Sequence, residues 1–520
     1  MTAFAVLSGP LPKLGVIAVA LLAGAVITLR NPVSRAWAML GALVLSPILL
    51  LVDIWHSPQL GIIHRHPVEV AVAAAVAVGL LAGAAVLLHR RPRLIAPLAM
   101  VALPFRIPIQ SGGSTADLLV LLYFVVAAGC LAWLVPTLRA ASAGRPAPRR
   151  RQAEPEVTID GVHFFEKALA AFVVLYAIQA VYSVSFVTAL QNMVFFYVPF
   201  ALLMRLLRDM RWDRELLTRC LGVTVALAVL FACVGYVEYA TKSLLLNPSL
   251  IARLDVHPYF TVNSVFFDPD IFGRYLALVM ILVSAVLLRE RRPRWQIGAC
   301  VVLAMLWAGL VLTLSRSSLG ALLVGLAVLA ALRWKVWPVL TAGAVVIVVG
   351  LVALAVSPST FGLNQGLNGA SSGRANLVSG GARMFSQRPV YGYGSGAFVT
   401  QYRKENKVGP NSLAASHTIP ITVGAEQGLV GEVVYLVLVI SALIALFRGT
   451  RADPARAAIA AAFLALLLHT MLYADFLEDP ITWALLAIGG ALAVQSRQSE
   501  LSAAEAERHR RRTVPAPAGA

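Results

Sequence analysis

A basic segment between two strongly apolar stretches contains the residue types needed to bind an anion and to move a proton. The segment, Ser357–Thr418, carries six basic residues against the single acid Glu405. Arg374 and Arg388 are among the basic residues, and His417 lies at its end. Guanidinium groups form paired hydrogen bonds with phosphate oxygens, and a neutral imidazole accepts a proton near pH 7. The segment therefore predicts a phosphate site with a proton acceptor.

A second candidate for anion binding is Arg316, which lies between two apolar runs in the sequence LSRSSLG. One interpretation is that its long side chain reaches the lipid headgroups from the edge of a bilayer. The other is that its guanidinium, flanked by Ser315 and Ser317, makes bidentate contact with a phosphate. We expect Arg316 to belong to the same site as Arg374.

Acids in or next to apolar runs form a further set of candidates. Asp268, Asp270 and Arg274 occur in NSVFFDPDIFGRYLAL, where an aspartate before a helix caps its free N–H groups. We expect this capping role for at least one of the two aspartates. Glu426 and Glu432 lie inside a later apolar run, where an ionisable group is costly and is usually paired or functional.

Composition places the chain among membrane proteins. Of its 520 residues, 59% are hydrophobic and 13% are charged, and the mean hydropathy is +0.79, well outside the soluble range. The net charge of +18 comes from short clusters between apolar runs, which indicates anchoring at a membrane and not nucleic-acid binding. The four cysteines lie in apolar runs without paired spacing, so no disulfide or metal site is predicted.

With about 20 apolar residues taken as one crossing, the sequence predicts an all-α, polytopic protein with about 14–15 transmembrane helices. The weakest of the expected spans is 94–109, which is short and carries Arg106 among prolines. The expected parts are N-terminal spans (1–138), a cytoplasmic basic linker (139–162), a transmembrane core (163–356), a large loop with short helices (357–418), C-terminal spans (419–496) and a cytoplasmic tail (497–520).

The basic clusters predict the orientation of these spans. Short cytoplasmic loops are enriched in Lys and Arg, and all the clusters fall on one side if fifteen spans cross. This arrangement places the N-terminus and the 357–418 loop outside and the C-terminus in the cytoplasm. The charge of the loop then cannot be explained by cytoplasmic anchoring.

Four motifs in a fixed order resemble the O-antigen ligase and O-antigen polymerase superfamily. They are FFDPDIFGRYLAL, LSRSSLGA, SGRANLV with RPVYGYGSGAF, and SHTIPITVGAEQGLVGEVVYL, and together they cover about residues 260–440. The chain has His417–Thr418 where the family often has His-Asn, and Pro269–Asp270 where it often has Pro-Asn. These two departures concern the class of acceptor more than the fold.

The resemblance implies a membrane glycosyltransferase of the GT-C type without a cofactor. Such an enzyme transfers a glycan from an undecaprenyl diphosphate donor to a hydroxyl of a saccharide or glycolipid acceptor, at the outer face of a bacterial cytoplasmic membrane. By motif, His417, Arg316 and Arg374 are the expected catalytic residues. Residues expected to bind the diphosphate or glycan are Arg106, Arg274, Arg388, Asp268 and Tyr393.

Fixed guanidinium donors in a cavity with little water stabilise the charge that a diphosphate leaving group gathers. We therefore expect metal-independent transfer with inversion, in which His417 takes the proton of the acceptor hydroxyl. A polysaccharide polymerase remains an alternative within this class. A polytopic transporter or a lipid-glycan binding protein is the alternative from another class, because Glu426 and Glu432 lie within an apolar run.

Overall fold

The computed structural model describes most of the chain. The described residues are 9–54, 66–105, 107–111, 114–145, 160–244, 260–266, 268–334, 374–407 and 418–513, with 337, 338, 341 and 343. Most of the span expected at 337–356 lies outside these ranges, as do His417 and Arg106.

Helices dominate the described residues. In chain order the elements are α2 (Pro10–Thr28), α3 (Pro32–Ile54), α5 (Pro67–Arg90), η2 (Pro92–Leu94), α6 (Ile95–Ala102), β1 (Ile107–Ser111), β2 (Ser114–Leu118), α7 (Val120–Ser142), α8 (Asp160–Ala180), α9 (Phe186–Asn192), the π-helix η3 (Met193–Tyr197), α10 (Val198–Arg208), α11 (Arg214–Thr241), α13 (Pro269–Leu287), α14 (Pro293–Leu312), α15 (Arg316–Arg333), α18 (Arg374–Gln387), α19 (Phe398–Asn406), α20 (Ile419–Phe447), α21 (Pro454–Leu472) and α22 (Pro480–Thr513).

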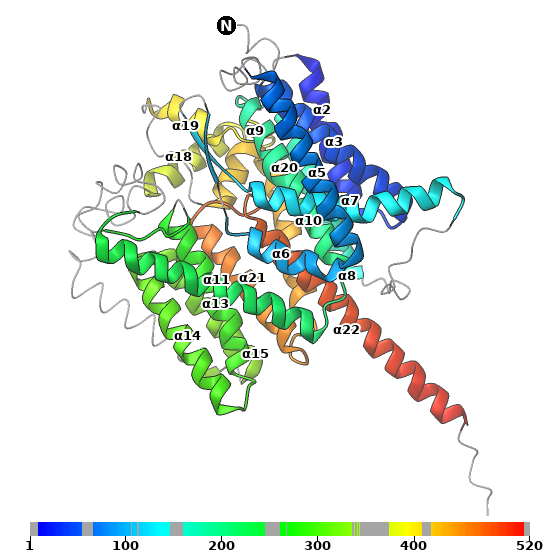
Figure 1. Cartoon of the computed structure of the whole chain (residues 1–520). Coiled ribbons are helices and arrows are strands. Elements are labelled where there is room, and N and C mark those ends of the chain that lie inside the picture. The colour runs from blue at the N-terminus through cyan, green and yellow to red at the C-terminus, as the bar shows by residue number, and fades with distance from the viewer. Residues whose placement is uncertain are drawn as a thin grey trace, which may run out of the picture.

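Twelve helices within the described residues are long and apolar enough to cross a membrane, which confirms the all-α polytopic fold. They form the bundle seen in Figure 1. Its interior is packed with large side chains from several helices, among them Phe165 of α8 and Trp483 of α22. At its edge, α5 exposes apolar residues such as Val68 and Leu80. In a protein of this class such an apolar surface faces lipid.

The expectation of a continuous span at 94–109 is wrong. In its place the chain forms the short helix α6 and then an antiparallel pair of strands, β1 and β2, with Ile107 opposite Leu118 and Ser111 opposite Ser114. Proline lacks a backbone N–H and disrupts helix continuation. Pro104 and Pro108, followed by the polar sequence QSGGST, explain why the helix does not continue.

The predicted basic clusters are joined by ion pairs at one end of the bundle. Arg35 at the start of α3 lies 2.7 Å from Asp209 at the end of α10. Arg93 of η2 pairs at 2.7 Å with Asp213, which precedes α11. Arg208 donates to Glu166 of α8 at 2.9 Å. The connections after α2, α5 and α10 therefore lie together, as the distribution of charge predicts.

The opposite end of the bundle carries α18 and α19, while the C-terminal part of α22 projects away from them (Figure 1). These two short helices lie within the segment 357–418, where short helices were predicted. The side chain of Arg383 in α18 connects the two helices, since its Nη2 donates to Asn406 Oδ1 of α19 at 2.8 Å. The N-terminal half of α20 packs against α18 through Ile421 and Gly381.

A break in α20 fixes the turn that follows α18. Gly428 has φ 65° and ψ −164°, a conformation reached almost only by glycine. The backbone groups released at this break bond to the turn, because Leu429 N donates to Pro389 O at 2.7 Å and Gly394 N donates to Glu426 O at 2.8 Å. The turn is therefore anchored to α20 by main-chain hydrogen bonds.

Glu426 strengthens the same anchor with its side chain. Its carboxylate accepts hydrogen bonds at 2.8 Å from the N–H groups of both Gly396 and Phe398. These residues lie just before and at the start of α19, so one buried acid holds the helix start in place. The expectation that an acid within this apolar run is paired is confirmed for Glu426.

Replacing Gly428 by Ala should destabilise the protein. An added Cβ would lie 2.4 Å from the carbonyl carbon of Val390, and the backbone conformation itself is strained for any L side chain. We expect a loss on the order of 2 kcal/mol or more, measured as a lower midpoint of thermal unfolding in detergent.

Gly83→Ala in α5 is the matched control, because an added Cβ there meets nothing within 4 Å. Alanine is the better helix former, so this variant should be neutral or slightly more stable. Equal midpoints for Gly428→Ala and the unmodified protein would contradict the proposed role of the break.

Candidate functional site

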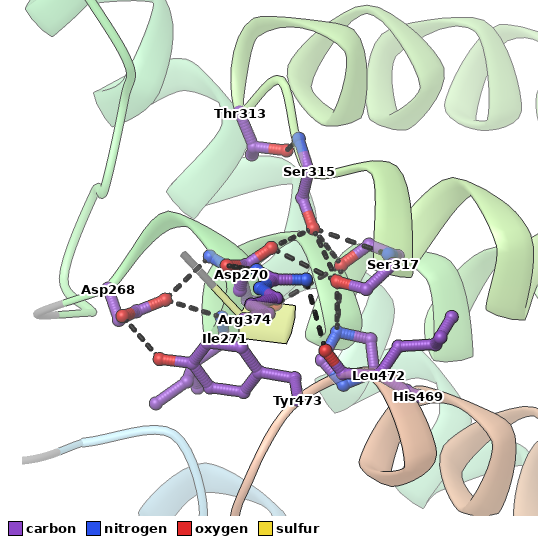
Figure 2. A network of polar contacts seen from close by, with 11 residues as sticks. Asp268, Asp270, Ile271, Thr313, Ser315, Ser317, Arg374, His469, Leu472 and Tyr473 are labelled. Carbon is purple, nitrogen blue, oxygen red and sulfur yellow. Dashed lines mark hydrogen bonds and ion pairs between the residues drawn. The ribbon is translucent and has the colours of Figure 1, made fainter. Parts of the chain in front are cut away.

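The start of α13 carries the first part of a polar network at the α18 end of the bundle, shown in Figure 2. Asp268 is the N-cap of α13, since its Oδ1 accepts from Asp270 N at 2.7 Å and from Ile271 N at 3.3 Å. Its Oδ2 accepts from the hydroxyl of Tyr473 at 2.5 Å. The predicted capping role is thus confirmed for Asp268.

Asp270 joins α13 to the start of α15. Its Oδ1 accepts hydrogen bonds from the hydroxyls of Ser315 and Ser317, the latter at 3.1 Å. Ser315 is also the N-cap of α15, because its Oγ accepts from Ser318 N at 3.2 Å. The serines that flank Arg316 therefore bind a carboxylate of the neighbouring helix, and the guanidinium between them is left for another partner.

His469 of α21 lies beneath these serines and is fully buried. Its Nε2 is 3.2 Å from Ser317 Oγ and 3.1 Å from Ser318 Oγ. Both hydroxyls already donate to Asp270, Ser317 to the carboxylate and Ser318 to the main-chain oxygen. Each serine hydroxyl has one proton to donate; with both of these protons directed at Asp270, Nε2 carries the imidazole proton of His469. The imidazole contacts the two serine hydroxyls from the interior of the bundle and has no exposed surface.

Sequence reasoning missed His469. It is the single ionisable residue in the run AAIAAAFLALLLHTML, and an ionisable residue within a span is a recognised signal of pairing or function. Its serine partners lie about 150 positions earlier in the chain, so the pairing itself is visible only in the fold.

Arg374, the first residue of α18, completes the network. Its Nη1 donates to the main-chain oxygen of Leu472 at 3.1 Å, and its Nη2 lies 3.6 Å from Asp270 Oδ2. The side chain remains 35% exposed. The guanidinium is thus held at the rim of the bundle with part of its surface open to a ligand.

Arg316 opens α15 between Ser315 and Ser317 and is exposed. It forms no hydrogen bond or ion pair with the residues that the structure describes. Its neighbours bind Asp270, which in turn faces Arg374, so the backbone of Arg316 lies beside the network that holds Arg374; that the two guanidinium groups share a ligand stays a prediction. The N-terminus of α15 adds its own partial positive charge there.

Two other predicted residues form a separate pair. The guanidinium of Arg388 stacks over the ring of Tyr393 at 4.5 Å from its centroid. Arg388 is exposed, and Tyr393 is largely buried with its hydroxyl donating to Gln387. This pair lies in the turn anchored to α20, and in the described part of the chain it makes no contact with Asp270.

Arg274 is placed differently from the other arginines, since it is only 1% exposed. Its Nη2 lies 2.6 Å from Asp479 Oδ2, and its Nη1 donates to the main-chain oxygen of Asp475 at 3.2 Å. It therefore ties α13 to the connection between α21 and α22. His417 and Arg106 lie outside the described residues, so their predicted roles stay predictions.

Burial sets the electrostatics of Asp268. Loss of contact with water, followed by the charge of Asp270, raises the pKa of Asp268 from 3.8 to about 6. Burial and the charge of Asp268 also raise the pKa of Tyr473, so this hydroxyl keeps its proton and donates it to the carboxylate. Protein groups contact both oxygens of both aspartates, so the pair connects α13 with α15, with α18 and with Tyr473, which follows α21.

The arrangement is suited to binding an anion at the rim of the bundle. The partly open guanidinium of Arg374 and the N-terminus of α15 lie at this network, and both favour phosphate. The buried serines and His469 hold these groups but are closed to a substrate.

Removing either partner of the buried Arg274–Asp479 pair should strongly destabilise the protein. A lone buried charge typically costs about 3–5 kcal/mol. We therefore expect Arg274→Ala and Asp479→Ala to lower the unfolding midpoint markedly, and Arg274→Leu with Asp479→Leu to recover part of that loss.

Arg383→Ala is the control, because Arg383 pairs with Glu405 at 3.6 Å and is 52% exposed; such pairs contribute about 0–1 kcal/mol. A stable Arg274→Ala protein with impaired ligand binding would place Arg274 at the ligand instead.

Asp268→Asn should change how stability depends on pH. The folded-state pKa of Asp268 is raised from 3.8 to about 6, so its favourable contribution is complete below about pH 4 and is lost as pH rises through about 6. Asparagine also caps helices but does not ionise. Unfolding midpoints measured from pH 4 to pH 7 should move in favour of the variant as pH rises. A constant difference between the two proteins across this range would refute the assignment.

Comparison with known proteins bears on the same elements. A family model described as O-antigen ligase matches residues 300–436, which include Arg316, Arg374 and the N-terminal part of α20. No curated protein matches the chain. The match confirms what the ordered motifs indicate: over the segment that supplies the exposed guanidinium groups, this membrane protein is similar to the O-antigen ligase and polymerase superfamily.

Proposed function

We propose that the protein transfers a glycan from an undecaprenyl diphosphate donor to a hydroxyl group of a lipid-linked or cell-envelope saccharide. The observation that carries the proposal is the position of Arg374. It lies in the family-matched segment, it is held at the rim of the bundle by Asp270 and Leu472, and its side chain is partly open. A partly open guanidinium at a bundle end suits a phosphate whose lipid tail stays in the bilayer.

The charge distribution supports an extracytoplasmic site. The paired basic clusters of Arg35, Arg93 and Arg208 lie at the end of the bundle away from α18. Cytoplasmic loops carry such clusters, so we assign this end to the cytoplasm of a bacterial cell and the network of Asp270 to the outer side.

The proposed reaction forms a bond between the acceptor oxygen and the anomeric carbon while the bond from that carbon to the diphosphate breaks. Arg316 and Arg374 bind the diphosphate and stabilise the charge that it gains on leaving. His417, which lies two residues before the first residue of α20 in the sequence, accepts the proton of the acceptor hydroxyl. Attack opposite the leaving group inverts the anomeric centre, and the arginines supply the positive charge without a metal.

The position of Glu426 disfavours the alternative that the protein is a transporter. A transporter needs polar groups that face a substrate pathway near mid-depth. The carboxylate of Glu426 is instead occupied by the N–H groups of Gly396 and Phe398, so it serves the anchor of the turn.

His417→Ala should abolish transfer and leave donor binding near its normal strength. General-base catalysis contributes about 10²–10⁴-fold, so we expect the rate to fall by at least about 100-fold. The assay incubates purified protein with a synthetic undecaprenyl diphosphate glycan and a panel of saccharide acceptors, and identifies products by mass. Donor binding is followed as the rise in unfolding temperature with donor concentration.

Arg383→Ala should keep full activity and serves as the control for a surface change in the same segment. One-step transfer to a foreign acceptor would indicate a ligase, and lengthening of the donor glycan would indicate a polymerase. Unchanged transfer by His417→Ala would remove the base assignment. Donor binding without any product would favour a binding or transport role.

A further inference from the structure

The guanidinium of Arg374 is held by one hydrogen bond and one longer ion pair, with groups from two different helices. Leu472 at the end of α21 offers its main-chain oxygen to Nη1, and Asp270 at the start of α13 faces Nη2. An arginine side chain has many rotamers, and fixing them in advance lowers the cost of binding a ligand. A hydrogen bond to one helix and an ion pair with another restrict the directions that the guanidinium can take.

Asp270 is itself fixed through its other oxygen. Ser315 and Ser317 both donate to Oδ1. Ser317 Oγ also lies 3.2 Å from Nε2 of His469. The oxygen that faces Arg374 is therefore set by α15 and α21 and not by the rotamer preference of Asp270 alone. The carboxylate links the starts of α15 and α18, where the two exposed arginines lie.

We propose that Asp270 is a positioning residue that orients Arg374, and through Ser315 and Ser317 the start of α15, for binding of a lipid-linked diphosphate. The proposal rests on the proposed function and adds the residue that aligns its arginines. Asp270 lies outside residues 300–436, so the family match assigns it no role.

The geometry distinguishes a positioning role from simple neutralisation of Arg374. The closest approach between Arg374 and Asp270 is 3.6 Å, whereas the buried pair Arg274–Asp479 approaches to 2.6 Å. A guanidinium has five N–H donors, and the contacts with Leu472 and Asp270 leave others open to phosphate. The hydroxyls of Ser315 and Ser317 already stabilise the carboxylate, so a diphosphate does not have to displace it.

The test is a double-mutant cycle on donor binding. The probe is a synthetic undecaprenyl diphosphate disaccharide, and the Kd is measured for the unmodified protein, Asp270→Asn, Arg374→Ala and the double variant. If Asp270 acts through Arg374, Asp270→Asn should weaken binding by up to about fivefold in the unmodified background, the size expected for a partly exposed ion pair. It should have almost no effect once Arg374 is absent.

Two further variants keep the test decisive. Ser317→Ala leaves the carboxylate in place but removes one of its donors, so it should weaken binding in the same direction, by about threefold; it carries the test if Asp270→Asn does not fold. Asp453→Asn is the matched control, because Asp453 caps α21 at the opposite end of the bundle and its loss should leave the Kd unchanged.

The outcomes separate this inference from the proposed function. Tighter binding by Asp270→Asn would show that the carboxylate competes with the donor, and equal weakening with and without Arg374 would show a general effect on the fold; either result overturns the positioning role. Normal binding by Arg374→Ala would overturn the assignment of the diphosphate site itself. Loss of binding with Arg374→Ala and normal binding with Asp270→Asn and Ser317→Ala would overturn only the inference.

Discussion

A carboxylate at the start of a membrane helix needs hydrogen-bond or ion-pair partners. At this end of the molecule those partners come from other helices and bring the helix starts together. Asp270 is surrounded by two serine hydroxyls from the start of α15 and by a guanidinium from the start of α18. The side chain of Asp270 is only 18% exposed, and withdrawing a carboxylate from water without such donors costs several kcal/mol, comparable with the whole stability of a protein. The starts of α13, α15 and α18 therefore have to meet at one place.

A second constraint acts on the far end of α18. The break in α20 at Gly428 exposes main-chain groups within the bundle, and the turn after α18 satisfies them. A lipid environment offers no water for these groups, so the turn cannot leave without a large cost. Helix α18 is thus fixed at its first residue by Asp270 and beyond its last residue by α20, which explains how a short polar helix holds a defined position on a membrane bundle.

The features of the fold that follow from local sequence could be predicted. Long apolar runs gave the helices, and the cap at Asp268 followed from an aspartate before a proline and an apolar run. The segment 94–109 was the weakest of the expected spans because of its prolines, and the helix does end before Pro104, but the strand pair that follows has no clear signal in the local sequence. That Arg316 and Arg374 share a site stays a prediction, although the serines beside Arg316 and the guanidinium of Arg374 contact the same carboxylate, Asp270.

The contacts that hold the site could not be predicted, because they join distant segments. Nothing near His469 in the sequence indicates Ser317 as its neighbour, and nothing near Arg274 indicates Asp479. Arg374 was predicted as a catalytic residue and Arg274 as a residue that binds the diphosphate or glycan, so both were expected to face the substrate. Burial separates them, because Arg274 has almost no exposed surface whereas Arg374 keeps a third of its side chain open.

The residues of the network lie partly inside and partly outside the segment that matches the family model. The segment similar to O-antigen ligases, 300–436, supplies Arg316, Arg374 and the serines. Asp270 precedes it, and His469, Leu472 and Tyr473 follow it. The groups suited to contact a substrate thus lie inside the segment, and most of the groups that orient them come from α13 and α21. Since α13 and α21 also pack through buried side chains in the bundle core, the orientation of the arginines depends on the whole transmembrane bundle and not on the matched segment alone.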